Sequence, residues 1–458
     1  MRIAVLVLLL TLLSTPAVSA EPEDNSLAGG VSSAVSASDA MKTVAAFDAI
    51  AKANGGNREA GKPGYEKSRE YVEGVLERAG YRLIRQPVPF RAFAADAETL
   101  TAPDGRKVRT LMAQYAPSGQ FSGPIAGAGA GCKAENYPQG TVIAVIRSGE
   151  CLSGDKTVAA RDAGVQAIVM YDVSPVIDTV IRRQVRGTVL PVSFVSQRDG
   201  EALIANPGVG QLDLRGRSFD ATTVNLFAET SGGRPDSVVM AGAHLDSGAD
   251  GPGINDNGTS AAALLETAVR LAPFQQKVPN KVRFAFWGAE ELINIGSIHY
   301  IQTRTPEELK AISLYLNWEL IASPNYVHFV IDGDDSDHAG TGAPPGPPGS
   351  GAVEAVMAQG YQLQGLPFRT ADLADIRSDQ EPFIGAGIPV GGAFGGVRGI
   401  KTADEAKVFG GTAGQPYDPC YHQPCDDLSN VNTKAFGEAL RAMAWAVTRF
   451  AIDDNLRK

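Results

Sequence analysis

The sequence predicts an α/β protein with a mixed, mostly parallel sheet covered by helices on both faces, and a smaller β-rich domain inserted into it. From about residue 224 onwards, apolar strand-like runs alternate with helix-like stretches. This is the pattern of parallel strands joined by crossover helices. Residues 99–225 instead show many short strands separated by Gly and Pro, which indicates the inserted β-rich domain.

Length and net charge limit the number of domains and the class of partner. The chain has 458 residues, which suggests two or three domains. It carries 41 Lys and Arg against 51 Asp and Glu, a formal net charge of −10. That charge argues against nucleic acid or an anionic membrane surface as the main partner.

The N-terminus is typical of an exported protein. Residues 1–20 have one Arg, an apolar run, and Val18 and Ala20 at the −3 and −1 positions of a cleavage site, so we expect a signal peptide. Residues 21–36, rich in Ser, Ala and Gly, are expected to be disordered. No Cys lies near the cleavage site and no other stretch is long and apolar enough to span a bilayer. We therefore expect a secreted or periplasmic protein without a membrane anchor.

The main domain is predicted in two parts, residues 37–98 and 226–452, on either side of the insertion. In the first part, helical patterns cover 41–53 and 63–80, and 81–90 alternates like a strand. In the second part we expect strands at 224–229, 237–243, 281–287, 313–318 and 326–331. We expect helices at 259–271, 290–302, 306–311, 352–360 and 433–450.

A histidine and an aspartate follow the strand 237–243. His244 stands at the end of this strand, and Asp256 lies twelve residues on, before the next helix. Ligands collect at the carboxyl ends of strands in an open parallel sheet, so we interpret the two residues as the start of a metal site. Asp246 can accept the ring N–H of His244 and fix its tautomer. With two carboxylate oxygens, Asp256 can bridge two ions.

Carboxylates also follow the next two strands. Glu290 and Glu291 come after KVRFAFW, where such a pair is unfavourable unless it is paired or bound to metal. Adjacent residues point to different sides, so one can bind a metal while the other acts on a bound water. Glu319 ends the following strand, and His422 lies inside CYHQPC, where a small disulfide loop would restrict it. The other histidines are interpreted as structural or loop residues: His299, His328 and His338.

The four cysteines form two local pairs, Cys132 with Cys151 and Cys420 with Cys425. In an exported chain this spacing favours two disulfides over free thiols. A cysteine zinc site is disfavoured, because the pairs lack the usual two-residue spacing with a second matching knuckle.

The stretch GTVIAVIRSGECLSGDKTVAARDAGVQAIVMYD, residues 140–172, resembles the protease-associated (PA) domain, a small α/β module inserted into exported hydrolases. The resemblance covers a strand, a Cys, a helix and the next strand. It implies that residues 99–225 form a PA domain. The block contains no His, which fits substrate access or contact rather than catalysis.

Five further motifs resemble the M28 zinc peptidases, and most closely the secreted bacterial aminopeptidases of that family. The motifs are AHLDS…GPGINDNGTSAAALLE, RFAFWGAEELINIGS, YLNWELIASPNY, RSDQEPFIGAGIP and DPCYHQPCDDLSNV. They follow the order of the family across roughly residues 225–450. The resemblance implies the zinc-exopeptidase, phosphorylase/hydrolase-like fold and two Zn²⁺ per chain.

The same resemblance implies roles for individual residues. Asp256 would bridge the two zinc ions. His244 and Glu319 would complete one site, and Glu291 and His422 would complete the other. Glu290 would be the general base, and Tyr421 would donate to the oxyanion. Arg377 would lie in the substrate pocket, and Asp246 would be the partner of the His244 ring. In the family the peptide bond after the bridging Asp is cis, so we expect a cis bond between Asp256 and Asn257.

One position departs from the family pattern, which has Asp where this chain has Glu319. The extra methylene moves the carboxylate by about one C–C bond, whereas a zinc–oxygen bond needs about 2.0–2.2 Å. The backbone must retreat or the zinc must shift. We therefore expect two properties to differ from the family. They are the zinc affinity on the His244 side and the pocket for the free amine of a substrate.

The expected function is hydrolysis of the N-terminal bond of peptides by a secreted zinc aminopeptidase, with Glu290 as base for a metal-bound water. A zinc glutaminyl cyclase shares this fold and uses one zinc, and another amide hydrolase activity is a further alternative. A non-catalytic binding module would be expected to lose ligands, whereas only one position is altered here, and conservatively. Metal stoichiometry separates these alternatives.

Overall fold

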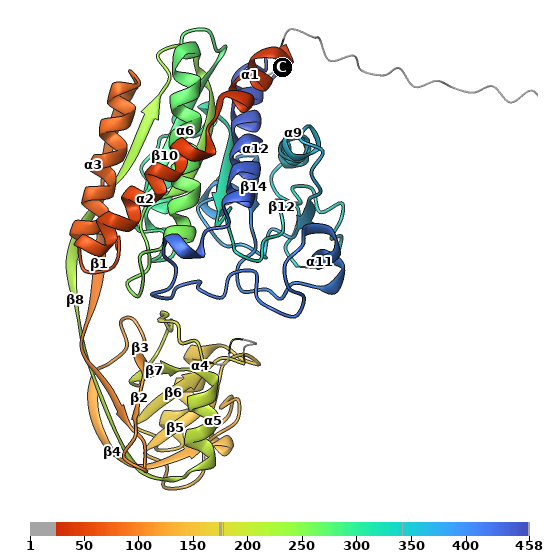
Figure 1. Ribbon diagram of the computed structural model, residues 1–458. Helices are drawn as coiled ribbons and strands as arrows, with labels where there is room; N and C mark the ends of the chain where they lie inside the picture. The colour runs from red at the N-terminus through yellow and green to blue at the C-terminus, as the bar shows by residue number, and fades with distance from the viewer. Residues whose placement is uncertain (1–23, 174–175, 177, 341, 457–458) are drawn as a thin grey trace, which may run out of the picture.

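The computed structural model describes residues 24–173, 176, 178–340 and 342–456, so the expected signal peptide, residues 1–20, lies outside the described residues. Two bodies are visible in Figure 1. The larger body is a sheet between helices. The smaller body is connected to the larger one by a two-stranded antiparallel ribbon, formed by β1 (Arg82–Thr101) and β8 (Gly208–Glu229).

The larger body is built on a mixed, mostly parallel sheet, as the sequence predicts. Its remaining strands are β9 (Arg234–His244), β10 (Asn280–Trp287), β11 (Ile312–Glu319), β12 (Phe329–Ile331), β13 (Arg369–Ala371) and β14 (Val390–Phe394). They run in the order β13-β12-β14-β11-β9-β10-β8. β9 lies between β10 and β11 and is parallel to both, and β14 is parallel to β11. β8 is antiparallel to its neighbour β10, and β12 is antiparallel to its neighbour β14. The central strands are buried along most of their length because both faces of the sheet are covered.

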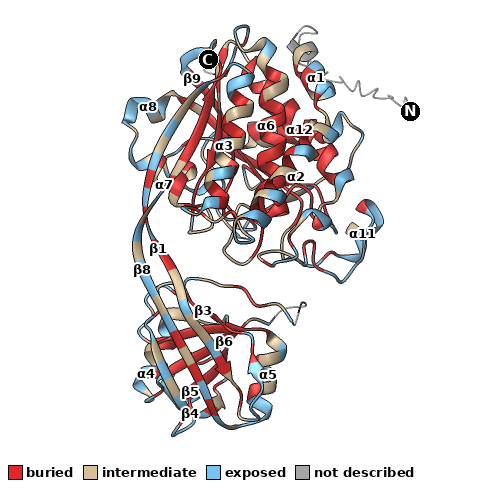
Figure 2. Cartoon of the chain, turned by 60° about the vertical axis from the view of Figure 1, so that its left-hand side comes forward, coloured by how far each residue is buried: buried red, intermediate tan, exposed pale blue. Residues whose placement is uncertain are grey.

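Helices cover both faces of this sheet. They are α2 (Ala37–Ala53), α3 (Pro63–Arg78), α6 (Ser260–Leu271), α7 (Ile295–Gln302), α8 (Pro306–Ala311), α9 (Ser350–Gln362), α10 (Glu381–Gly385), α11 (Ala403–Phe409) and α12 (Thr433–Ala451). One face packs mainly on α2, α3, α6 and α12, whose inner sides are buried in Figure 2. The other face carries an aromatic cluster around Trp287, Tyr300, Tyr315 and Phe383. Among the described residues, no helix is long and apolar enough to cross a membrane.

The expectation of disorder over residues 21–36 is wrong for the part that the structure describes. Asp24–Ala34 forms helix α1, which packs on α12. Ala28 and Val31 are buried against the core, and the Ser32 hydroxyl donates a hydrogen bond to the Arg441 carbonyl at 2.9 Å. The composition is that of a disordered tail, but contact with the C-terminal helix supplies the burial that the segment lacks by itself.

The smaller body contains the segment that resembles a PA domain. Its strands are β2 (Lys107–Val108), β3 (Leu111–Met112), β4 (Gly119–Gly127), β5 (Ile143–Arg147), β6 (Ala167–Tyr171) and β7 (Val192–Val195), with helices α4 (Ser153–Asp162) and α5 (Gln197–Ala205). β4 to β7 are parallel neighbours over a core of their own. β1 and β8 pair antiparallel from Arg82 opposite Glu229 to Thr101 opposite Gln211, so they belong to both bodies.

Candidate active site

The candidate ligands come together at the carboxyl ends of neighbouring strands. His244 ends β9, Glu319 ends β11, and Glu290 and Glu291 follow β10. The register places His244 opposite Trp287. In-register parallel strands thus bring these side chains to one edge of the sheet, as the sequence predicts.

Glu290 and Glu291 lie in a turn, not in a helix as expected for residues 290–302. The helix α7 begins only at Ile295. Ala289, Ile293 and Asn294 have positive φ values of 62°, 70° and 56°, which a helix does not allow. The apolar spacing favours a helix, but the turn is fixed by distant contacts that local pattern does not contain.

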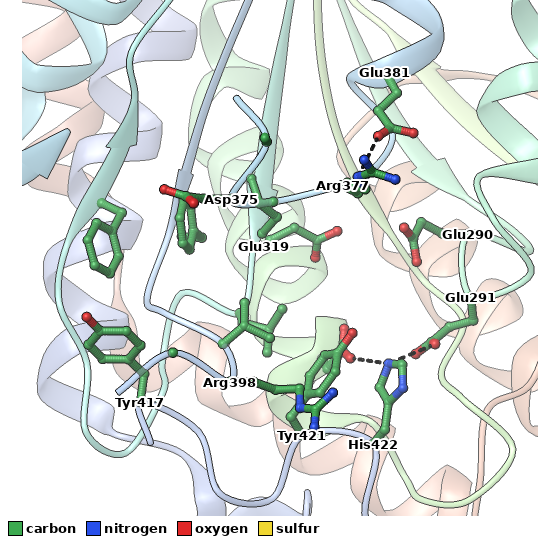
Figure 3. A pocket seen from close by; sticks show the side chains of 18 of the residues that line it. Glu290, Glu291, Glu319, Asp375, Arg377, Glu381, Arg398, Tyr417, Tyr421 and His422 are labelled. Atoms are coloured by element: carbon green, nitrogen blue, oxygen red, sulfur yellow. Dashed lines mark ion pairs between the residues drawn. The ribbon is translucent and has the colours of Figure 1, made fainter. Parts of the chain in front are cut away.

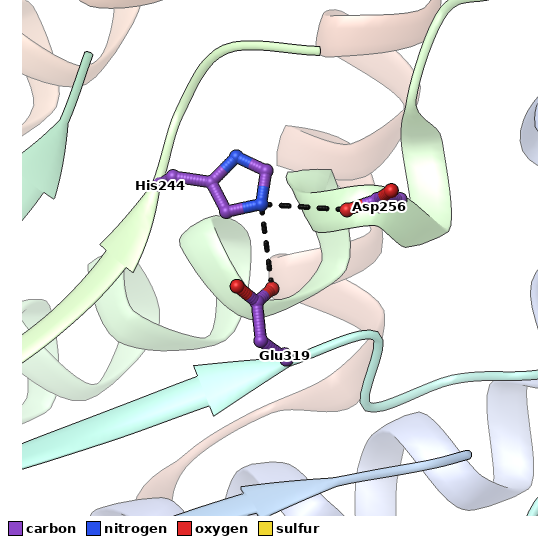
Figure 4. A group of neighbouring side chains, drawn as sticks. All are labelled: His244, Asp256 and Glu319. Carbon is purple, nitrogen blue, oxygen red and sulfur yellow. Dashed lines mark ion pairs between the residues drawn. The ribbon is translucent and has the colours of Figure 1, made fainter. Parts of the chain in front are cut away.

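His244, Asp256 and Glu319 form a first triplet, shown in Figure 4. The Nε2 atom of His244 lies 3.3 Å from Asp256 Oδ1 and 3.3 Å from Glu319 Oε2. All three side chains are buried. The longer Glu319 side chain thus places one carboxylate oxygen beside both His244 and Asp256.

Asp256, Glu291 and His422 form a second triplet. The Nε2 atom of His422 lies 3.1 Å from Asp256 Oδ2 and 3.0 Å from Glu291 Oε2. The contact between His422 and Glu291 is dashed in Figure 3. Asp256 thus presents one carboxylate oxygen to each triplet. The peptide bond between Asp256 and Asn257 is cis, in agreement with the expectation.

Three buried carboxylate oxygens of the triplets accept no hydrogen bond from any residue that the structure describes. They are Asp256 Oδ2, Glu291 Oε1 and Glu319 Oε2. A buried, unsatisfied carboxylate oxygen is unfavourable unless a cation is bound to it. Imidazole nitrogens and carboxylate oxygens are the ligands that zinc takes in catalytic sites. The residues present therefore fit a pair of zinc ions.

The electrostatics of the triplets are those of a cation site. Burial acts to lower the pKa of His244, but the carboxylates of Glu319 and Glu290 outweigh it and hold that pKa well above its usual range. His422 behaves alike, because Glu291 and Asp256 outweigh its burial. Burial raises the pKa of Glu319. Negative charge is thus concentrated where positive charge is needed to balance it.

Asp246 contacts the His244 ring and also a second part of the site. Its carboxylate lies 3.5 Å from His244 Nδ1, whereas its backbone carbonyl is closer, at 3.1 Å. The carboxylate also accepts the backbone N–H groups of Glu290 and Glu291, at 3.2 and 3.3 Å. Asp246 therefore links the loop after β9 to the turn after β10, in addition to orienting the imidazole.

Three supporting residues were not identified from the sequence. Arg58, fully buried, donates to the carbonyls of Leu245, Pro252 and Gly253 and so holds the loop between His244 and Asp256. The second is Asp426, whose carboxylate accepts the backbone N–H groups of Asn255 and Asp256 at 2.9 and 3.0 Å. The third is Ser378, whose hydroxyl donates to Glu319. Asp426 and Ser378 stand inside quoted motifs, but nothing in the local pattern marks Arg58.

A chain of hydrogen bonds ends on Glu319. The Trp287 indole N–H donates to the Tyr315 hydroxyl at 2.8 Å, and that hydroxyl donates to Asn317 Oδ1 at 2.7 Å. Asn317 Nδ2 donates to Ser378 Oγ at 3.1 Å, and Ser378 donates to Glu319 Oε1. An indole N–H can only donate, so the Tyr315 hydroxyl accepts from Trp287 and its own proton points to Asn317. The Ser378 hydroxyl likewise accepts from Asn317 and its proton points to Glu319. The chain commits Glu319 Oε1 to Ser378 and leaves Oε2 facing His244.

The triplets open into a cavity of about 1240 Å³. Glu290, Tyr421 and Arg377, each predicted to take part in the reaction, all line it. The Tyr421 ring stacks on His422 with centroids 3.9 Å apart. Arg377 lies at the rim with its side chain 80% exposed, 3.9 Å from Glu381. Figure 3 shows how these side chains surround Glu319.

The remaining histidines and the cysteines lie as expected. His328 is buried, and its Nε2 atom is hydrogen-bonded to Glu438 Oε2 at 2.9 Å, a structural contact. His299 is on α7, and His338 lines the cavity without belonging to either triplet. The disulfides join Cys132 to Cys151 and Cys420 to Cys425, and the second encloses Tyr421 and His422.

Comparison with known proteins agrees with this geometry. The sequence model of peptidase family M28 matches residues 225–447 of this chain, and the sequence model of the PA domain matches residues 121–203. A solved zinc aminopeptidase from Bacillus subtilis has the same fold, with a TM-score of 0.70 at 22% identity, covering 93% of this chain and 97% of that chain.

Two curated relatives are similar over most of the chain. An aminopeptidase of Pseudomonas aeruginosa (strain UCBPP-PA14) is 38% identical, over 93% of this chain and 83% of its own length. Leucine aminopeptidase 2 of Trichophyton equinum is 33% identical, over 86% of this chain and 80% of its own length. The candidate ligands meet at the strand ends, and the Pseudomonas aeruginosa aminopeptidase is 38% identical over 93% of this chain. The chain therefore belongs to peptidase family M28, with an inserted PA domain.

Proposed function

We propose that this M28 enzyme, a metallo-aminopeptidase, releases one N-terminal residue at a time from peptides, with two zinc ions held by the two triplets and Glu290 as general base. The observation that carries the proposal is the Asp256 carboxylate, which presents one oxygen to each triplet. Glu290 lies beside His244 and belongs to neither triplet. It is therefore free to act on a proton.

Each residue of the cavity has a part in the proposed reaction. Zinc ions bound there would lower the pKa of a coordinated water towards neutrality. Glu290 accepts the proton of the attacking water and returns it to the leaving amine. Burial and the Asp256 carboxylate raise the pKa of Tyr421, so its hydroxyl stays protonated and donates to the developing oxyanion.

We also propose that the mature protein acts outside the cytoplasm. The two disulfides support this, because disulfides persist in oxidising compartments such as the periplasm and the medium. The expected signal peptide agrees with it. The substrates would then be extracellular or periplasmic peptides.

Hydrolysis of aminoacyl-nitroanilides tests the proposal. We expect cleavage of substrates with a free amine, loss of cleavage with a chelator, and recovery on adding zinc. Phe329, Ile376 and Phe394 give the cavity an apolar side, so Leu and Phe substrates should be cleaved faster than Asp substrates. Cleavage of N-acetylated substrates at the same rate would show that no amine is recognised. No cleavage by protein containing two zinc ions would contradict the proposal.

Replacing Ser378 with Ala is expected to weaken metal binding at the first triplet selectively. The variant removes the only hydrogen bond to Glu319 Oε1 that the described residues provide, so the carboxylate is no longer held with Oε2 towards His244. Loss of such a supporting contact typically weakens metal affinity about 10- to 100-fold. Zinc titration followed by metal analysis should show one weakened site and one unchanged site.

A matched control is Ser237→Ala, at the other end of β9. Ser237 is also buried and hydrogen-bonded, its hydroxyl donating to Asn280 at 2.8 Å. This variant should lose stability without changing either metal affinity. Equal zinc affinities in Ser378→Ala and the native protein would show that Ser378 does not position Glu319.

A further inference from the structure

Part of the wall of the catalytic cavity comes from the PA domain. Residues 181, 183, 184 and 186, in the segment before β7, line the cavity together with the metal triplets. Gln423, the residue after His422, donates from Nε2 to the carbonyl of Val180 at 2.9 Å. This buried contact fixes the segment next to the second triplet. A peptide bound at the triplets therefore lies against PA-domain side chains.

A second contact between the two bodies involves two arginines and one carboxylate. Asp172, just after β6, lies 2.6 Å from Arg183 Nη2 within the PA domain and 3.5 Å from Arg398 Nη2 of the peptidase body. Its other oxygen accepts from the Ser148 hydroxyl. Arg183 and Arg398 both line the cavity. One carboxylate thus balances only one of the two guanidiniums.

Arg186 adds a third guanidinium to this wall. It is exposed, lines the cavity, and has no carboxylate within 4.0 Å among the described residues. We call Arg183, Arg186 and Arg398 the arginine cluster. Three guanidiniums against the single Asp172 carboxylate leave a surplus of two positive charges. In a chain whose net charge is −10, this surplus is local to the cavity.

Among the described residues, Asp172 is the only carboxylate within 4.0 Å of the three arginines, and Glu405, which also lines the cavity, accepts instead from the Tyr417 hydroxyl. In the view of Figure 3, Arg398 lies below Glu319, whereas Asp375 and Glu381 lie above it. Glu381 is also the partner of Arg377, at 3.9 Å. The carboxylates of the triplets are those that the metal ions would balance. The arginine cluster is therefore the part of the wall with unbalanced positive charge.

The cavity has room for more than the N-terminal residue of a substrate. Its volume of about 1240 Å³ exceeds the roughly 300–1,000 Å³ of ordinary small-molecule pockets. An extended peptide advances about 3.3–3.6 Å per residue. With its first peptide bond at the triplets, a peptide places its next residues along the remaining wall. Guanidinium groups bind carboxylates with two parallel hydrogen bonds, a geometry that an ammonium group does not offer.

We propose that the arginine cluster is a subsite for a carboxylate of the substrate, located downstream of the residue that is released. The carboxylate is the side chain of an Asp or Glu near the N-terminus, or the C-terminal carboxylate of a short peptide. This inference rests on the aminopeptidase function proposed above and adds a substrate class to it. It also gives the PA domain a defined role, because two of the three arginines belong to that domain.

Matched peptides test the subsite and separate the two sources of the carboxylate. In amidated tetrapeptides that begin with Leu, Glu is compared with Gln at positions two, three and four. In a second set, Leu-Gly-Gly is compared with its amide. We expect kcat/KM to be about 10-fold higher for the carboxylate at the position that reaches the cluster, the scale of one charge-assisted hydrogen bond. The preference should fall as salt concentration rises.

Variants assign the preference to the cluster. The exposed Arg186 is replaced by Gln alone and together with Arg398→Gln, and we expect the ratio between the Glu and Gln peptides to fall stepwise towards one. Arg161→Gln is the matched control, since Arg161 is an exposed arginine on α4 of the same domain and is absent from the cavity. It should leave the ratio unchanged. Thermal unfolding of each variant checks that the fold is kept.

The outcomes that overturn the inference are distinct from those that overturn the proposed function. Native protein that cleaves Leu-nitroanilide but shows no preference between Glu and Gln peptides, or between free acid and amide, refutes the subsite and leaves the aminopeptidase function standing. A preference that survives the double substitution also refutes it. Absence of any hydrolysis by zinc-loaded protein refutes both.

Discussion

Replacing Glu290 with Gln is expected to lower kcat by about 10²- to 10⁴-fold while the metal content stays unchanged, the range expected for loss of a general base. The amide keeps the size and shape of the side chain but does not accept the proton of the attacking water. Glu290 Oε2 lies 3.6 Å from His244 Nε2, and the residue belongs to neither ligand triplet. Metal analysis and nitroanilide kinetics on the same preparation check both parts of the prediction.

The control for this variant is Glu307→Gln, a substitution at an exposed position on α8. It should behave as native protein in both measurements. Loss of zinc from Glu290→Gln would identify Glu290 as a ligand rather than a base. Turnover close to that of native protein would mean that another group takes the proton.

Replacing Asp256 with Asn is expected to abolish binding of both metal ions, and activity with it. The carboxylate contributes one oxygen to each triplet, so the neutral amide weakens both sites at once. Glu319→Gln and Glu291→Gln should each affect mainly one site, because each residue belongs to one triplet. The expected zinc content is about two per chain in native protein, near zero in Asp256→Asn and about one in each glutamate variant.

Thermal unfolding provides a second measurement for the Asp256 variant. Zinc that binds only the folded state raises its stability, and a Kd 1,000-fold below the free zinc concentration adds about 4.1 kcal/mol. Added zinc should therefore raise the Tm of native protein and leave that of Asp256→Asn unchanged. Asp404→Asn, at an exposed position on α11, is the control and should respond as native protein does. Retention of one zinc by Asp256→Asn would show that Asp256 does not bridge.

The sequence by itself determined the strands that carry the site and most of its candidate ligands. Strands buried on both faces read as continuous apolar runs, so 237–243 and 281–287 were placed to within a few residues of β9 and β10. His244 and Glu319 end such strands, which made them recognisable before any contact was known. The helix 306–311 has the bounds that the sequence predicts, because Thr305 and Glu308 cap it locally.

Only the tertiary structure decided how those ligands are supported. Arg58 binds the Leu245 carbonyl across 187 positions of sequence, and Ser378 binds Glu319 across 59. Residues 24–34 are helical because they pack on α12, and Glu290 stands in a turn because the surrounding fold imposes positive φ on its neighbours. Local spacing reports which face of an element is apolar. It does not report which distant residue forms a hydrogen bond with a buried donor, carbonyl or carboxylate. Such long-range hydrogen bonds set the geometry of this site.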